Sequence, residues 1–382
     1  MRKLLLLTLI LLLGFLFACG GSSRPQSVTS TFAFIQEAPN YSYAFTPMLG
    51  QFVVTGSKVA FEATAAAMDA GTGNPVKGEF YSIVLSPDGK KATFDLLGGT
   101  LDSPTDQWDI WVANADTSNI MQITNDSYDD ALPQFSPDGT KVVFASYRPV
   151  PETEAAYQWQ IVIRNVTGSG EQVLPIPDGV IYQFHPSYSP DGGKIVMTAS
   201  GYTSQEVPFA GIYVVNADGS NPTLLTNPLY SSESCYYCQD EDPVFTADGT
   251  KIVFSRYNDT NNAVEDVYIM NADGTGVTQL TDGTAVNADP SLITIQGVGD
   301  RILFNSNRSN PSNWGSATFD LYSMKFDGTG VTRLTNNALY DGLSGEWYDV
   351  YGTANAASKR VLGRNQPAPY RGHLPVTRPN LK

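Results

Sequence analysis

Few side chains in this sequence could carry out chemistry. The chain has two histidines, His185 and His373, and three cysteines. A serine hydrolase triad would need a Gly-x-Ser-x-Gly motif in an α/β domain, and no such domain is recognisable. The sequence therefore predicts no catalytic residue and no enzyme.

The densest charged group is acidic. Asp240, Glu241 and Asp242 are consecutive. Carboxylates are ligands for Ca²⁺, but this run lacks the spaced oxygen ligands of a recognisable calcium loop. We expect no metal and no cofactor, with Ca²⁺ at this group as the alternative.

Two cysteines form a C-x-x-C pair, Cys235 and Cys238. A zinc site would need further ligands, and neither a second cysteine pair nor a nearby histidine exists. A redox motif would sit at a helix N-terminus in a βαβ unit, whereas the surrounding sequence is typical of strands. We predict a disulfide between the two cysteines, in a compartment that permits oxidation.

These residues lie in a repeating pattern. An apolar strand ends at a tight turn, a strand rich in β-formers follows, and after a loop a third strand is joined through an Asn-Ala-Asp-Gly hairpin to a fourth that ends in Leu-Thr or Ile-Thr. The turn glycines are spaced by 50, 53 and 57 residues: Gly89, Gly139, Gly192 and Gly249. Four-stranded units of this period predict a β-propeller, because one such sheet cannot bury both faces until neighbours pack on it.

The runs SPDGTKVVF at 136–144 and IYVVNADGSNPTLLT at 212–226 resemble the TolB-type repeat, also called the WD40-like or PD40 repeat. The resemblance covers residues 80–335. Similar repeats occur in the periplasmic protein TolB, in the propeller domains of peptidases and in an oligogalacturonate lyase family. The fold is therefore better indicated than the function. A lyase of that family would be expected to have several clustered histidine ligands, which this chain lacks.

The N-terminus has the features of an export signal. Arg2 and Lys3 precede an apolar run that is short for a membrane span, and Leu16-Phe17-Ala18-Cys19 resembles a bacterial lipobox. We predict that residues 1–19 are a lipoprotein signal with Cys19 as the lipidated residue, and that 20–30 are a flexible tether. Gly20 after the cysteine resembles lipoproteins of the outer membrane, facing either the periplasm or the cell surface. An ordinary signal peptide is the alternative.

We predict one all-β domain at residues 31–364 and a proline-rich basic tail at 365–382. Five units begin near residues 80, 130, 183, 240 and 289. A sixth blade is expected to combine strands from both termini, with Trp347–Tyr351 and Arg360–Leu362 as its first two strands, because a shared blade removes the open edges of the ring. Seven blades are the alternative, if residues 31–78 form a blade of their own.

The candidate binding site follows from this arrangement. His185, Asp242 and Asp289 occupy equivalent positions, predicted to be the starts of the strands that line the central channel. Asp240 and Glu241 are adjacent, so we expect a negatively charged channel mouth. Ordinary solvated turn residues are the other interpretation of these positions.

Composition narrows the function. The formal net charge is −15, which disfavours nucleic-acid binding because phosphate contacts need Lys and Arg. We expect a monomeric, non-enzymatic scaffold tethered to a membrane, binding a protein partner of the cell envelope. A module for a glycan or other extracellular ligand is the first alternative, suggested by Trp314, Trp347, Tyr236 and Tyr237. A hydrolase or lyase of a propeller-containing family is the second.

Overall fold

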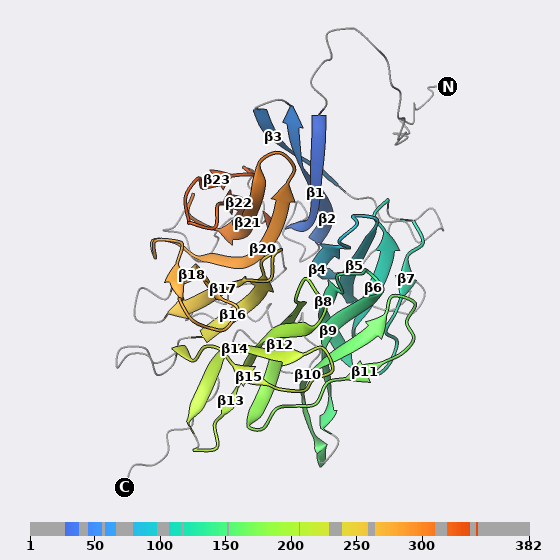
Figure 1. The fold of residues 1–382 in the computed structure, drawn as a ribbon. Coiled ribbons are helices and arrows are strands. Elements are labelled where there is room, and N and C mark those ends of the chain that lie inside the picture. Colours follow the sequence, from blue (N-terminus) through green and yellow to red (C-terminus); the bar gives the residue numbers. More distant parts are fainter. Residues whose placement is uncertain are drawn as a thin grey trace, which may run out of the picture.

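The chain forms a ring of β-sheets (Figure 1). The computed structural model describes residues 27–37, 45–55, 58–65, 79–97, 107–116, 118–150, 153–205, 207–228, 239–258, 264–309, 319–336 and 341–342. Within these ranges lie 24 strands, arranged in six sheets of four antiparallel strands. None of the described segments is a helix long and apolar enough to cross a membrane. The six-bladed propeller predicted from the sequence is confirmed.

Five blades follow one another along the chain, each built from the inside of the ring outward. Blade 1 contains β4 (Glu79–Leu85), β5 (Lys91–Leu97), β6 (Trp108–Asn114) and β7 (Met121–Gln122). Blade 2 contains β8 (Asp129–Phe135), β9 (Lys141–Val150), β10 (Thr153–Asn165) and β11 (Gln172–Val173). Blade 3 contains β12 (Val180–Tyr188), β13 (Lys194–Tyr202), β14 (Pro208–Asn216) and β15 (Thr223–Leu224). Blade 4 contains β16 (Gln239–Phe245), β17 (Lys251–Asn258), β18 (Val264–Asn271) and β19 (Thr278–Gln279). Blade 5 contains β20 (Asn287–Ile295), β21 (Gly299–Ser306), β22 (Asp320–Met324) and β23 (Thr332–Arg333).

The sixth blade, here the closing blade, takes strands from both ends of the chain. Its order is β24 (Asp341–Gly342), β1 (Ser27–Glu37), β2 (Phe45–Thr55) and β3 (Lys58–Ala65). Shared closure is confirmed, but the division differs from the predicted one. The N-terminal segment supplies three strands instead of two, because its hairpin is preceded by the long strand β1. The C-terminal strands expected at Trp347–Tyr351 and Arg360–Leu362 lie outside the described residues.

The turns between the first and second strands are held by their own side chains. In blade 1 the Ser86 hydroxyl donates to Asp88 Oδ1 at 2.7 Å, and the Lys90 backbone N–H donates to the same oxygen at 3.0 Å. Gly89 has φ 67°, which glycine adopts without a steric penalty. In blade 2 the equivalent contacts, led by the Ser136 hydroxyl, lower the pKa of Asp138 to about 2. The aspartates of these turns are therefore structural, in agreement with the repeat.

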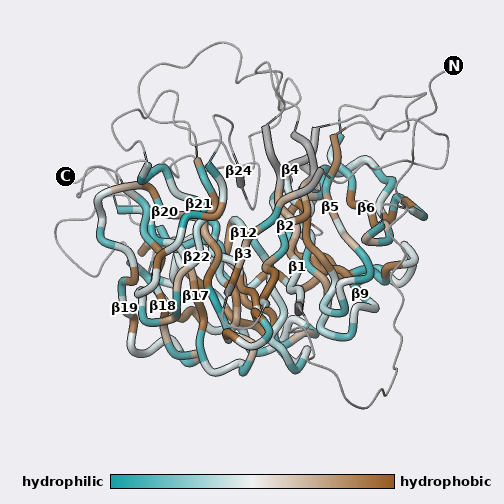
Figure 2. The backbone as a smooth tube through the Cα atoms, turned by 90° about the horizontal axis from the view of Figure 1, so that it is seen from above, coloured by the Kyte–Doolittle hydropathy of each residue, from teal (hydrophilic) through white to brown (hydrophobic). Residues whose placement is uncertain are grey.

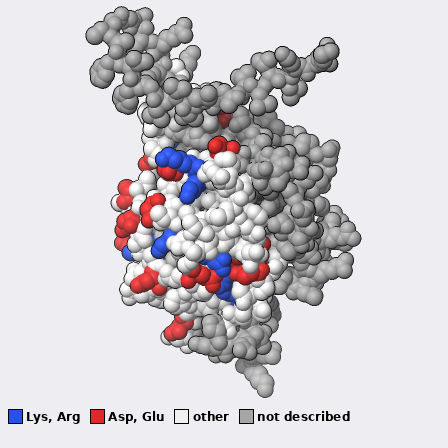
Figure 3. Space-filling model, turned by 90° about the vertical axis from the view of Figure 1, so that its right-hand side faces the viewer, with Lys and Arg blue, Asp and Glu red and all other residues white. Residues whose placement is uncertain are grey.

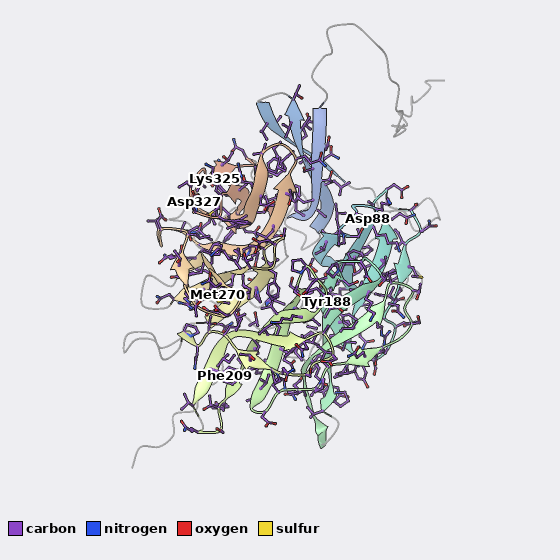
Figure 4. All side chains as sticks on the ribbon, viewed as in Figure 1. Asp88, Tyr188, Phe209, Met270, Lys325 and Asp327 are labelled. Carbon is purple, nitrogen blue, oxygen red and sulfur yellow. The ribbon has the colours of Figure 1, made fainter. Side chains whose placement is uncertain are left out.

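The second set of turns, between third and fourth strands, is built in the same way at the outer rim. Asp327 Oδ1 accepts the Thr329 backbone N–H at 2.9 Å, and in Figure 4 Asp327 and Lys325 lie at the outside of the ring. Both sets of turns belong to one face of the ring, which we call the turn face. The opposite face, where second strands lead to third strands, is the loop face.

The Leu-Thr and Ile-Thr endings have a structural cause. The threonine hydroxyl oxygen accepts a backbone N–H from the third strand of its own blade: Ile110 to Thr124 at 2.8 Å, and Val267 to Thr281 at 3.0 Å. The preceding apolar residue, such as Ile123, is buried between blades. The dipeptide therefore both caps and packs the outer edge of the blade.

The hydrophobic core lies between neighbouring blades. Four phenylalanines at equivalent positions of the second strands have no exposed surface: Phe94, Phe144, Phe254 and Phe304. Burying each such ring contributes roughly 1.5–3 kcal/mol relative to leaving it exposed. Figure 2 shows hydrophobic stretches along the strands and hydrophilic ones in the turns, and in Figure 3 acidic and basic side chains lie interspersed on the outer surface.

Candidate functional site

The inner strands of blades 1 to 5 each contain a β-bulge. In blade 4 the register shifts between Glu241 and Val244, so that two residues, Asp242 and Pro243, are opposite one residue of β17. Four of these bulges carry a residue with positive φ directly before a proline: Leu132 at 60°, His185 at 48°, Asp242 at 53° and Asp289 at 50°. These positions were predicted to be strand starts. They lie instead inside their strands, which begin between two and five residues earlier.

The bulge residues line a central cavity of about 1270 Å³. Leu132, His185, Asp242 and Asp289 all contribute to its wall, although each belongs to a different blade. His185, Asp242 and Asp289 therefore share one cavity wall, and their role in binding stays a prediction. A bulge turns a side chain out of the normal alternation of a strand, which explains why these residues face the cavity.

The polar groups of the cavity are held by hydrogen bonds from the wall. His185 Nε2 lies 3.1 Å from Asp242 Oδ1, which links blades 3 and 4. The Ser255 hydroxyl donates to Asp242 Oδ2 at 3.1 Å, and Asn305 Nδ2 donates to Asp289 Oδ2 at 2.5 Å. The side chains of His185 and Asp242 are 13% and 11% exposed, so both remain accessible from the cavity.

In blade 1 the second-strand position that corresponds to Ser255 and Asn305 is occupied by an acid, Asp95 on β5. Asp95 is fully buried and accepts the backbone N–H groups of Ser82 at 2.5 Å and Leu132 at 2.8 Å. Burial raises its pKa to about 6. Asp95 thus holds the bulges of two adjacent blades, whereas Ser255 and Asn305 each bond the bulge residue of their own blade.

Asp240 and Glu241 do not form part of a channel rim. Asp240 has no exposed surface and forms two bonds to Arg256, at 2.5 Å to Nε and 2.8 Å to Nη2. Glu241 is 4% exposed. One carboxylate oxygen from each of Glu241, Asp242 and Glu265 lies within 4.8 Å of the other two. The expected acidic mouth is therefore wrong in part. Strand alternation directs Asp240 into the seam between blades.

The carboxylates available to a Ca²⁺ ion also differ from the consecutive group expected. Asp240 is engaged by Arg256, whereas Glu265, from β18, joins Glu241 and Asp242. Glu265 could not be recognised from the sequence, since 22 residues separate it from Asp242 in the chain. The expectation of no metal and no cofactor, and its alternative of Ca²⁺ at Asp240, Glu241 and Asp242, both stay predictions.

The remaining wall of the cavity combines apolar side chains, such as Phe32, Leu49 and Ile83, with polar side chains that are mostly uncharged. Its hydroxyl and amide side chains are Thr29, Ser30, Thr31, Gln51, Ser82, Gln134, Ser187, Ser291, Thr294 and Gln296. The lining reaches the turn face at Ser86–Lys90 and Asn114–Asp116. Residues of β1 also line the cavity, which the sequence analysis did not predict. The position of β1 beside the inner strands is set only when the ring closes, so no local sequence pattern reveals it.

A second set of acids occupies the seams. Asp130 has the same position in blade 2 as Asp240 in blade 4, and is also completely buried. Ser146 replaces the arginine as the cross-strand neighbour of Asp130. Burial raises the pKa of Asp130 to about 8, with the Ser146 hydroxyl and Arg148 opposing the shift. The carboxyl group is therefore neutral at pH 7.

Several predicted sites lie outside the described residues. These are the lipidation site Cys19, the cysteines Cys235 and Cys238, and the aromatic residues Trp314, Trp347, Tyr236 and Tyr237. Their assignments stay predictions.

Comparison with known proteins establishes the fold class. No family model matches the chain. The uncharacterized protein Atu1656 of Agrobacterium fabrum is 28% identical over 162 residues, which cover 41% of this chain and 53% of that protein. The chain therefore matches about half the length of this relative.

Two solved structures are similar over most of the chain. TolB from Acinetobacter baumannii has a TM-score of 0.57 at 17% identity, covering 82% of this chain and 65% of that one. The putative TolB from Agrobacterium tumefaciens has a TM-score of 0.52 at 16% identity, covering 84% and 92%. The predicted TolB-like propeller fold is confirmed. At this identity the similarity extends to the fold alone.

Proposed function

We propose that this protein is an exported, non-enzymatic binding scaffold whose central cavity receives a cationic segment of a protein partner in the cell envelope. The observation that carries the proposal is the convergence of Asp242 and Asp289 on one cavity, each from a different blade. Their side chains are held in place by Ser255 and Asn305, so that little ordering is required when a partner binds.

The cavity chemistry fits an extended peptide. Hydroxyl and amide side chains along the wall offer hydrogen bonds to peptide groups, and the two carboxylates mark the place for a lysine or arginine side chain. A net charge of −15 would add steering of a cationic partner. The contact is therefore expected to weaken as ionic strength rises.

The proposed location rests on the N-terminal sequence and on the similarity to TolB structures. We infer an envelope lipoprotein attached through Cys19, in the outer membrane, facing the periplasm or the cell surface. Cys19→Ala should abolish labelling by palmitate and release the protein from membranes. Membrane fractionation of that variant would contradict the anchor if the protein still sediments with membranes.

The binding proposal is tested by comparative capture. Envelopes would be cross-linked with the wild-type protein, with Asp242→Lys/Asp289→Lys, and with the exposed charge control Glu62→Lys/Asp178→Lys. Mass spectrometry should identify a protein that the wild type and the control retain and the cavity variant loses. Equal recovery of every protein by all three would overturn the proposal.

A glycan ligand is the second candidate, favoured by the hydroxyl and amide lining of the cavity. Neutral sugars would bind independently of salt and of the Asp-to-Lys changes unless the carboxylates bond directly to sugar hydroxyls. Titration with maltotriose at two salt concentrations distinguishes this ligand from a cationic one.

A further inference from the structure

A row of aromatic rings crosses the seam between blades 2 and 3 at the loop face. Ring centroids are separated by 5.6 Å between Tyr157 and Tyr147, 5.5 Å between Tyr147 and Trp159, and 5.0 Å between Trp159 and Phe184. Tyr182 stacks on Phe184 at 6.5 Å. The row therefore joins two strands of blade 2 to the inner strand of blade 3.

One end of this row, Tyr157, is exposed, whereas Trp159 and Phe184 in its middle are buried. Trp159 and Phe184 are 4% and 8% exposed, which is typical of packing between blades. Tyr157 is 49% exposed, and Tyr147 and Tyr182 are part-buried. Packing between blades is a sufficient reason for an aromatic residue at Trp159 and at Phe184. It is not a sufficient reason at Tyr157, because about half of that side chain is exposed to water.

An acid accompanies the tyrosines. Asp129 is the direct cross-strand neighbour of Tyr147, and Trp159 is the neighbour on the other side. Asp129 Oδ1 accepts the backbone N–H of Trp108 in blade 1 at 3.1 Å, which holds this oxygen on the side of blade 1. Directly paired residues of antiparallel strands have Cβ atoms roughly 4.5–5.5 Å apart, so Asp129 adjoins Tyr147 through the strand pairing. Burial raises the pKa of Tyr147, and Tyr182, Tyr157 and Asp129 raise it further.

The side chain of Arg148 on β9 does not lie beside Asp129 and the three tyrosines. Arg148 follows Tyr147, so its side chain leaves the opposite face of the strand. It lies 5.0 Å from the centre of the Tyr128 ring, donates to Ser146 at 3.0 Å and pairs with Glu171 at 3.1 Å. Arg148 is therefore engaged away from the face of β9 that carries Tyr147.

We propose that Tyr147, Tyr157, Tyr182 and Asp129 form a receptor for a lysine or arginine side chain of a protein partner at the loop face. Aromatic faces attract a cation through their quadrupole, and a nearby carboxylate supplies the opposite charge. A neutral sugar would use the rings equally well but gains nothing from the charge of Asp129. The acid therefore favours a cationic peptide.

This receptor is distinct from the cavity. The cavity lining reaches the turn face, whereas Tyr157 lies near the β9–β10 connection at the opposite face. The inference does not depend on the proposed function, and either can fail without the other. A partner that contacted both would gain from two linked contacts.

The test uses the peptide Ac-Gly-Arg-Gly-Arg-Gly-NH₂ and the same peptide with citrulline in place of arginine. Calorimetric titration of the full chain should show binding of the arginine peptide and much weaker binding of the citrulline peptide. Tyr157→Ala should weaken binding roughly two- to fivefold. Tyr157→Phe should preserve it, because the ring remains. Asp129→Asn should remove most of the salt dependence.

Controls separate this site from general charge and from loss of folding. Asp300→Asn removes one acid at the turn face of blade 5 and should leave peptide affinity unchanged, as should Val277→Ala, which alters an exposed apolar residue of blade 4. Each variant must retain the thermal transition of the wild type. Equal affinity for both peptides, or unchanged affinity in both Tyr157→Ala and Asp129→Asn, would overturn the inference. Maltotriose binding that Tyr157→Ala removes, without arginine-peptide binding, would also overturn it and indicate a glycan site.

Discussion

Asp240 and Asp242 lie two residues apart on β16 and have opposite roles. Asp240 has no exposed surface and is bonded twice to Arg256, within the seam of the ring. Asp242 faces the cavity, beside His185 and Ser255. In a regular strand two residues of this spacing share one face, and the bulge that begins at Asp242 changes that relationship. The bulge therefore decides which acids hold the ring together and which can meet a ligand.

The seam position also differs between blades. Asp240 has an arginine partner, whereas Asp130 in blade 2 has Ser146 at the corresponding place and is neutral at pH 7. Both arrangements avoid an unpaired buried charge, one by pairing it and the other by protonation. Blades 2 and 4 therefore both have a buried aspartate at this position, but the residue opposite it differs between the two blades.

The largest effect is expected from breaking the pair in blade 4. Arg256→Ala leaves the Asp240 carboxylate buried without its guanidinium, and should lower the free energy of unfolding by roughly 3–5 kcal/mol. Urea denaturation at pH 7 measures this loss. The double variant Arg256→Ala/Asp240→Asn should recover part of it, because no charge then remains buried.

Arg301→Ala is the matched control. Arg301 donates to the Asp300 carbonyl at 2.8 Å and has no resolved ion pair with a carboxylate in the described structure, so its removal should cost less than about 1 kcal/mol. A similarly small loss for Arg256→Ala would show that the seam pair does not stabilise the ring, and the contrast with Asp242 would fail.

A smaller effect, dependent on pH, is expected at Asp130. Its pKa is about 8 in the folded protein against an ordinary value of 3.8. Between about pH 4 and pH 8 the carboxyl group of Asp130 therefore holds a proton in the folded state that it has lost in the unfolded state. The free energy of unfolding must then fall as pH rises from about 4 to 8. Between pH 6 and 8 the loss should be on the order of 2 kcal/mol. Asp130→Asn should remove this component, since Asn does not titrate.

The range above pH 6 is chosen because two other buried acids titrate lower. Asp95 and Asp109 have a pKa of about 6, raised by burial, and contribute mainly at more acidic pH. Parallel stability curves for the wild type and Asp130→Asn from pH 6 to 8 would mean that Asp130 is already ionised in the folded protein.

The smallest effect on stability is expected at the cavity. Asp242→Asn and Asp289→Asn keep the shape of each side chain and the donors from Ser255 and Asn305, so each should change the free energy of unfolding by less than about 1.5 kcal/mol. Thermal unfolding measures the difference. A loss as large as that of Arg256→Ala would place these acids among the residues that hold the ring together.

The sequence was sufficient to predict the fold but not the arrangement of the candidate site, and the reason is physical. The Asp-Gly turns and Leu-Thr endings are local signals, and each uses hydrogen bonds within its own blade, as with Asp88 and Thr124. The number of blades followed from their spacing. Shared closure of the ring also followed, because an open edge would otherwise remain at each terminus.

The separation of Asp240 from Asp242 could not be obtained in this way. A bulge shows in the pairing register and in a positive φ, neither of which consecutive acidic letters reveal. The pre-proline position was a usable signal, since His185, Asp242 and Asp289 all share it. Glu265 and the tyrosines of the loop face depend on contacts between distant strands, and only the assembled ring brings them together.

The most direct test of the central claim measures binding at the cavity with a purified partner identified by comparative capture. The mature chain, Asp242→Lys/Asp289→Lys and Glu62→Lys/Asp178→Lys would be titrated with that partner at 50 and 300 mM salt. The account predicts that the cavity variant loses at least about tenfold in affinity together with most of the salt dependence, while the control, with the same net charge, remains close to the wild type. Equal affinity and an equal salt response in all three folded proteins would contradict it and place binding on another surface.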